Sequence, residues 1–175
     1  MTATKGIDFA QLTLRDGLDL AISIEEEARD RYRDFAEQLT LHHTVEAANF
    51  FARMARVEEI HRLRLAERRQ ALFPGEVSRV MRDNVFDVEA PEFDEVRVFM
   101  SVEQALKTAL AAEEKAYDFF ARAVPILLDV EVRKLFTELR DEEMEHQALV
   151  KQEMARTSAE PTPNEEAYGD EPVAQ

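Results

Sequence analysis

The chain has no cysteine and no tryptophan among its 175 residues, and only four glycines and six prolines. The missing thiols exclude disulfides, thiolate metal ligands, iron–sulfur clusters and cysteine nucleophiles. The shortage of glycine and proline leaves little material for tight hairpins between strands. The expected fold class is therefore all-α.

Positive charge is also scarce, because 22 lysines and arginines face 37 aspartates and glutamates and leave a formal net charge of -15. Such a surface repels phosphate backbones and anionic lipids, so no nucleic acid and no membrane is expected as a partner. No apolar run reaches the roughly 18 residues of a membrane span, and the first residues lack the apolar stretch of a secretory signal. A soluble, cytoplasmic protein of one domain is expected.

Four long segments carry apolar residues at the three- and four-residue spacing of amphipathic helices. Ser101 and Gln104 form a capping-box pattern before the third segment, and Pro74-Gly75 follows the second. The predicted helices span about 13–39, 44–72, 101–124 and 129–156. They predict a four-helix bundle over residues 1–156, with a long crossover at 73–100 and an acidic, disordered tail at 157–175.

The two halves of the chain repeat each other. The segment AISIEEEARDRYRDFA aligns without gaps on ALAAEEKAYDFFARA, so that Glu113 takes the place of Glu25. VEEIH aligns on EEMEH, so the Glu-x-x-His pattern that begins at Glu58 recurs at Glu143. The repeat predicts a pseudo-symmetric bundle made of two helical hairpins.

Each predicted helix places a glutamate on the apolar stripe that should face the core. In the first helix, Glu25 lies between Ile22 and Ala28, at the spacing that keeps all three on one face. Two of the helices add a histidine one turn after the glutamate. The polar residues on the four stripes are Glu25, Glu58, His61, Glu113, Glu143 and His146.

Four carboxylates in one core destabilise it, since burying even one unpaired charge costs several kcal/mol and like charges repel. Two divalent cations would cancel four negative charges, and each histidine would add one neutral nitrogen ligand. Oxygen-rich coordination with one imidazole per ion suits iron, or manganese, better than zinc. The six residues therefore predict a dimetal centre of the kind that four-helix bundles hold between facing helices.

The same residues leave alternatives open. A register shift of one residue would select Glu114 or Glu142 as a ligand instead, although the internal repeat disfavours the shift. Tyr32 either hydrogen-bonds a metal-bound carboxylate or only fills the core, as its repeat partner Phe120 would. A bundle that has lost its metal and kept these side chains is a further hypothesis.

The segments EEEARDRY, EEIH, AAEEKAYDFF and EEMEH resemble the rubrerythrin branch of the ferritin-like superfamily, and nearly as closely bacterioferritin, over about residues 13–155. The resemblance implies a ferritin-like bundle that binds two iron ions, with Glu58 and Glu143 bridging them. The terminal ligands would be Glu25, Glu113, His61 and His146. It also implies a homodimer or larger homo-oligomer, and oxidation of Fe(II) by hydrogen peroxide or dioxygen.

The chain departs from both relatives at informative positions. Rubrerythrins usually carry a rubredoxin domain with a cysteine-bound iron, so a chain without cysteine would need an external electron donor. Their additional carboxylate, one turn after the ligand in the third helix, is Ala116 here, and ligand exchange is therefore not expected. Glu59 stands where bacterioferritin has its haem-binding methionine, so no haem is expected.

These features favour a di-iron oxidoreductase, acting as a rubrerythrin-like peroxidase or a ferroxidase in oxidative-stress defence or iron handling. The alternative is a non-catalytic bundle that binds and delivers iron through the same ligands. The two hypotheses differ in whether bound Fe(II) is oxidised faster than free Fe(II).

Overall fold

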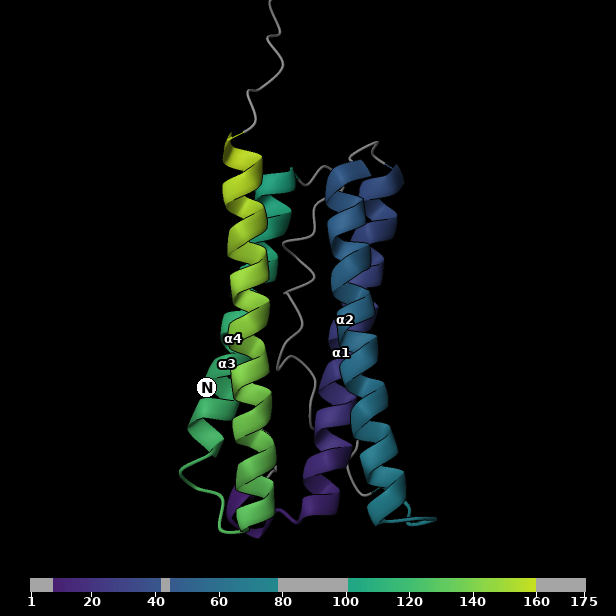
Figure 1. The fold of residues 1–175 in the computed structure, drawn as a ribbon, viewed down its shortest axis with the longest axis vertical. Coiled ribbons are helices and arrows are strands. Elements are labelled where there is room, and N and C mark those ends of the chain that lie inside the picture. The colour runs from purple at the N-terminus through teal and green to yellow at the C-terminus, as the bar shows by residue number, and fades with distance from the viewer. Residues whose placement is uncertain (1–7, 42–44, 79–100, 160–175) are drawn as a thin grey trace, which may run out of the picture.

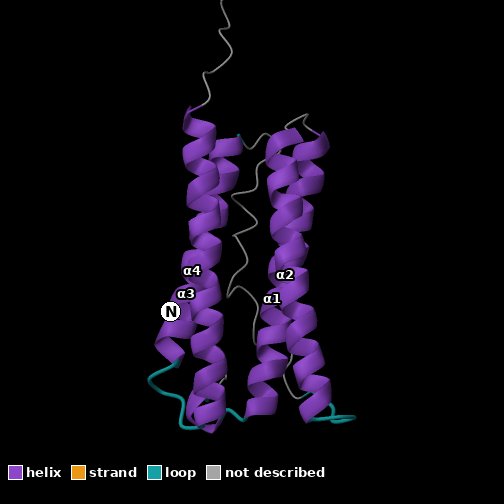
Figure 2. Cartoon of the chain, viewed as in Figure 1, coloured by secondary structure: helices purple, strands orange, loops and turns teal. Residues whose placement is uncertain are grey.

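The computed structural model describes residues 8–41, 45–78 and 101–159. Most of this part of the chain is helical (Figure 1). The elements are η1 (Phe9–Gln11), α1 (Leu14–Leu41), α2 (Val45–Leu72), α3 (Val102–Ala123) and α4 (Val130–Ala159). These described ranges contain no strand (Figure 2), which confirms the predicted all-α, four-helix fold.

The helices begin and end within one turn of the predicted bounds. At the start of α3, the backbone N–H of Gln104 donates to Ser101 Oγ at 3.2 Å and the backbone N–H of Ser101 donates to Gln104 Oε1 at 3.0 Å. This is the predicted capping box. The crossover predicted at 73–100 lies outside the described residues from position 79 onward.

The tail predicted from residue 157 begins later than expected, because α4 continues to Ala159. The hydroxyl groups of Thr157 and Ser158 donate to backbone oxygens in the preceding turn, including that of Met154. Neither residue stops a helix as proline does, and the first proline after them is Pro161. The tail from residue 160 onward lies outside the described residues.

The four helices form two antiparallel hairpins, α1 with α2 and α3 with α4, and the hairpins lie side by side (Figure 1). In this view α2 ends at the lower end of the bundle, whereas α3 begins at the upper end. The two consecutive helices α2 and α3 therefore run in the same direction, as in bundles that have a long crossover connection. No helix within the described ranges is both long and apolar enough to cross a membrane.

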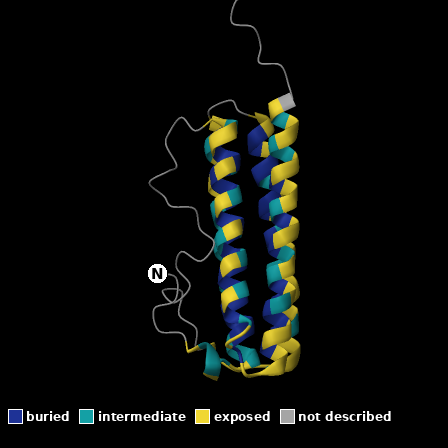
Figure 3. Ribbon diagram, turned by 90° about the vertical axis from the view of Figure 1, so that its left-hand side faces the viewer, coloured by how far each residue is buried: buried dark blue, intermediate teal, exposed yellow. Residues whose placement is uncertain are grey.

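Buried residues lie along the inner sides of the helices and exposed residues along their outer sides (Figure 3). The apolar core consists of two clusters, one above the other. The lower cluster includes Leu18, Phe120 and Phe136, and the upper cluster includes Phe51 and Leu106. Every helix runs from one cluster to the other, and the polar residues of its inner stripe lie between them.

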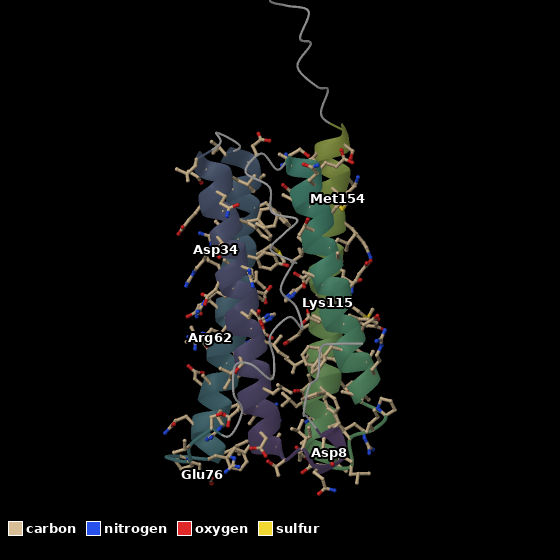
Figure 4. The ribbon with its side chains drawn as sticks, turned by 180° about the vertical axis from the view of Figure 1, so that it is seen from behind. Asp8, Asp34, Arg62, Glu76, Lys115 and Met154 are labelled. Carbon is tan, nitrogen blue, oxygen red and sulfur yellow. The ribbon has the colours of Figure 1, made fainter. Side chains whose placement is uncertain are left out.

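The lower end of the bundle is held by a close approach and a buried ion pair. A Cβ atom added to Gly17 of α1 would lie 3.3 Å from Val132 of α4, so glycine lets the two helices come close. Arg69 of α2 donates from Nε to Asp19 Oδ1 of α1 at 2.7 Å. The same guanidinium donates to the backbone oxygen of Glu76, which Figure 4 labels at this end of the molecule.

Candidate metal centre

A buried polar layer lies at mid-length of the bundle, between the two apolar clusters. The structure brings all six residues that the sequence singled out into this layer. They are Glu25 of α1, Glu58 and His61 of α2, Glu113 of α3, and Glu143 and His146 of α4. His61 keeps 14% of its side chain exposed, whereas the other five residues have at most 2% of their surface exposed.

One half of the layer is arranged around His146. Its Nδ1 atom lies 3.2 Å from Glu113 Oε2 and 3.4 Å from Glu143 Oε2. Donor atoms of these three residues all lie within 4.8 Å of one another. The hydroxyl of Tyr32 donates to the other oxygen of Glu113, so this side chain makes a polar contact besides packing in the core. We call the group of ligand candidates Glu113, Glu143 and His146 the inner position.

The other half is arranged around His61. Its Nδ1 atom lies 4.0 Å from Glu25 Oε2 and 3.9 Å from Glu142 Oε2, and the three donors again fit within 4.8 Å. We call this group the outer position, because the side chain of Glu142 is 35% exposed. The imidazoles of His61 and His146 stack with ring centroids 5.1 Å apart, so the two positions are neighbours. Glu58 groups with both His61 and His146, so its carboxylate lies between the two positions.

Burial and neighbouring charges shift the pKa of five residues of the layer. Burial raises the pKa of Glu25 to about 7 and holds the pKa of Glu58 and Glu143 well above the ordinary value. Burial lowers the pKa of His61 to about 4. Burial also acts to lower the pKa of His146, but the adjacent carboxylates outweigh it and raise that pKa well above normal. The protein alone therefore does not stabilise the negative charges of Glu25, Glu58 and Glu143.

Several buried atoms of the layer lack a hydrogen-bond partner. They are Glu25 Oε2, both carboxylate oxygens of Glu58, His61 Nδ1, Glu143 Oε2 and His146 Nε2. In the part of the chain that the structure describes, every unpaired buried side-chain atom belongs to this layer. Native interiors leave few polar atoms unpaired. Bound cations would engage these lone pairs, and a set rich in oxygen with one imidazole per position fits two ions of iron or manganese.

The structure also decides the register and adds one residue. Glu113 and Glu143 are buried, whereas Glu114 is exposed, as the internal repeat predicted. Glu142, which the internal repeat disfavoured as a ligand, nevertheless reaches the layer from its edge, beside His61. A signal for it was present, because the repeat partner of Glu142 is Val57, so the symmetry of the two halves is broken here.

Comparison with known proteins places this geometry in a family. The family model for rubrerythrin matches residues 16–154, a range that includes the whole layer. An uncharacterized conserved protein from Magnetospirillum magnetotacticum MS-1 is 27% identical in sequence, with a TM-score of 0.69 over 87% of this chain and 98% of that one. A hypothetical protein from Pyrococcus furiosus, 22% identical, shares the fold with a TM-score of 0.55 over 86% and 95%. No curated protein matches the chain significantly.

Proposed function

Since the chain belongs to the rubrerythrin family, we propose that it is a di-iron oxidoreductase that oxidises Fe(II) with hydrogen peroxide or dioxygen. The observation that carries this proposal is the set of buried, unpaired donor atoms in the polar layer. A vestigial site would be free to replace such atoms by apolar groups, which are neutral or stabilising in place of buried charge. Their presence on three helices, α1, α2 and α4, supports a working metal centre.

Different residues of the layer would hold each of the two ions. Glu113, Glu143 and His146 would hold one ion at the inner position. Glu25 and His61 would hold the second ion at the outer position, and Glu58 lies between the two. When bound, the two ions supply one electron each to an oxidant that contains an oxygen–oxygen bond.

The surrounding protein sets the conditions for this chemistry. Burial of the layer keeps bulk water away from the atoms that would bind metal. The hydrogen bond from Tyr32 fixes the orientation of Glu113. Because the pKa of Glu25 is raised to about 7, metal binding displaces protons from carboxylates that hold them near neutral pH. Oxidation of two Fe(II) by one hydrogen peroxide consumes two protons and yields two Fe(III) and two water molecules. Repeated turnover needs an external electron donor.

The proposal is tested by anaerobic titration of the apo-protein with Fe(II), followed by mixing with peroxide or dioxygen in a stopped-flow instrument. We expect saturation at about two irons per chain and oxidation faster than that of free Fe(II). A preference for peroxide identifies a peroxidase, and a preference for dioxygen identifies a ferroxidase.

Matched variants make this test specific. Glu58→Ala and Glu143→Ala should abolish stoichiometric binding, whereas Glu114→Ala, at an exposed position on α3, should not. Stoichiometric binding without faster oxidation would support an iron-binding and delivery bundle instead. If the wild-type protein binds no Fe(II), both functions are wrong.

A further inference from the structure

The inner and outer positions are built differently, although the chain is an internal repeat. At the inner position, Glu113 accepts a hydrogen bond from Tyr32. The repeat partner of Tyr32 is Phe120, which has no hydroxyl with which to hold Glu25 in the same way. Glu25 Oε2 is buried and has no hydrogen-bond partner. The carboxylate of the outer position therefore lacks the tyrosine hydroxyl that orients its counterpart.

A second difference lies at the edge of the layer. Glu142 of α4 has its Oε2 atom 3.9 Å from Nδ1 of His61 of α2. Its repeat partner, Val57, offers no donor atom to the other half of the layer. Glu142 is thus an additional carboxylate that serves one metal position and has no equivalent at the other.

The buried atoms of the outer position point to a ligand there. Nδ1 of His61 has no hydrogen-bond partner and faces both Glu142 and the unpaired Oε2 of Glu25, which is 4.0 Å away. Two carboxylates and one neutral imidazole match the charge of one divalent cation, and their donor types suit iron or manganese. Glu25 is nearly fully buried, and its unpaired Oε2 atom lies beside Nδ1 of His61, as does the carboxylate of Glu142.

The outer position is more exposed to solvent than the inner position. The side chains of His61 and Glu142 are 14% and 35% exposed, whereas those of Glu113, Glu143 and His146 are at most 3% exposed. A cation that arrives from solvent on this side meets Glu142 and His61 before it meets the inner donors. The outer position is consequently suited to exchange metal with solvent, and the inner position to retain it.

Resting on the proposed function, we propose that Glu142 is a seventh ligand that captures divalent metal from solvent at the outer position, together with His61 and Glu25. The two metal positions are then unequal in affinity and in loading rate, and Glu142 affects only one of them. The asymmetry comes from two positions at which the two halves of the chain differ. Glu142 has Val57 as its repeat partner, and Tyr32 has Phe120.

The test is a Co(II) titration of the apo-protein, followed by calorimetry and by the visible absorption of bound Co(II). In the wild type we expect two ions to bind per chain. In Glu142→Gln we expect one ion to bind as before and the other to bind at least about tenfold more weakly, with slower loading after rapid mixing. Glu142→Asp, which keeps the charge, should recover part of the affinity.

Glu145→Gln is the matched control, because it makes the same change in charge at an exposed position on the same helix. Equal weakening in this control would show that long-range charge, not ligation, explains the effect, and would overturn the inference. Unchanged binding in Glu142→Gln would also overturn it while leaving the proposed function intact. A wild type that binds no Co(II) and no Fe(II) would instead overturn the proposed function.

Discussion

The hydroxyl of Tyr32 shows how much one oxygen atom contributes inside a core. Tyr32 is 1% exposed and Glu113 is fully buried, so their hydrogen bond forms without competition from water. Hydrogen bonds to a charged acceptor are stronger than neutral ones, and low polarity strengthens them further. The bond fixes the orientation of a carboxylate that would otherwise rotate.

Replacing Tyr32 by phenylalanine tests this role. Tyr32→Phe keeps the ring in the upper cluster but removes the donor to Glu113. We expect Co(II) binding at the inner position to weaken by about tenfold, and the free energy of unfolding of the apo-protein to fall by about 1–3 kcal/mol. Titration and urea denaturation measure the two effects. Tyr117→Phe, at a half-buried position of α3, is the control. Unchanged metal binding in Tyr32→Phe would show that the ring only fills the core.

At the same scale, the sequence predicted the buried ligand candidates but kept Glu142 only as a disfavoured alternative. Glu143 lies on the inner stripe of its own helix, so its burial follows from helical periodicity alone. Glu142 lies one residue away, at the flank of that stripe, where its environment depends on the helix beside it. One such neighbour is His61 of α2, and the periodicity of α4 contains no information about α2.

Among the helices, α1 and α2 are fastened at their lower end by the ion pair between Asp19 and Arg69. The two residues are 8% and 9% exposed, so the pair is largely shielded from solvent. Arg69 also donates to the backbone oxygens of Phe73 and Glu76, which secures the turn after α2. The side chain of Arg69 therefore links α2 to α1 and to the turn that follows α2.

Removing this arginine should destabilise the hairpin. We expect Arg69→Met to lower the free energy of unfolding by about 3–5 kcal/mol, because it leaves Asp19 buried without a partner. Adding Asp19→Asn should restore part of the loss. Arg68→Met is the control, since Arg68 pairs with Glu138 at the surface, where such pairs contribute about 0–1 kcal/mol. Equal losses for Arg69→Met and Arg68→Met in urea denaturation would contradict this role for the buried pair.

For the whole molecule, the buried layer predicts how the stability of the apo-protein depends on pH. Above about pH 6.5, the folded protein holds more protons than the unfolded chain, because the pKa of Glu25 is raised to about 7 and those of Glu58, Glu143 and His146 are raised well above normal. The free energy of unfolding therefore falls as the pH rises from 6.5 through 7 and beyond. His61, whose pKa is lowered to about 4, acts in the opposite direction only between pH 4 and 6.5.

Scanning calorimetry of the metal-free protein at pH 6.5 and pH 8 measures this effect. We expect the lower Tm at pH 8, and the opposite trend once Co(II) is bound, because metal replaces the displaced protons and binds more tightly at higher pH. Glu58→Gln, which cannot ionise, should reduce the slope of the apo-protein. A Tm of the apo-protein that does not fall between these two pH values would contradict the electrostatics of the layer.

The sequence by itself determined the four helices, the internal repeat and the polar stripe residues Glu25, Glu58, His61, Glu113, Glu143 and His146. Helical periodicity is a local property. A carboxylate on an apolar stripe is therefore predicted to be buried, whichever element its helix packs against. The tertiary structure alone decided that Tyr32 holds Glu113, that Glu142 faces His61, and that the group around His61 is nearer to solvent than the group around His146. Each of these facts joins different helices, and contacts between helices depend on how their faces pack together, which no single segment of the chain encodes.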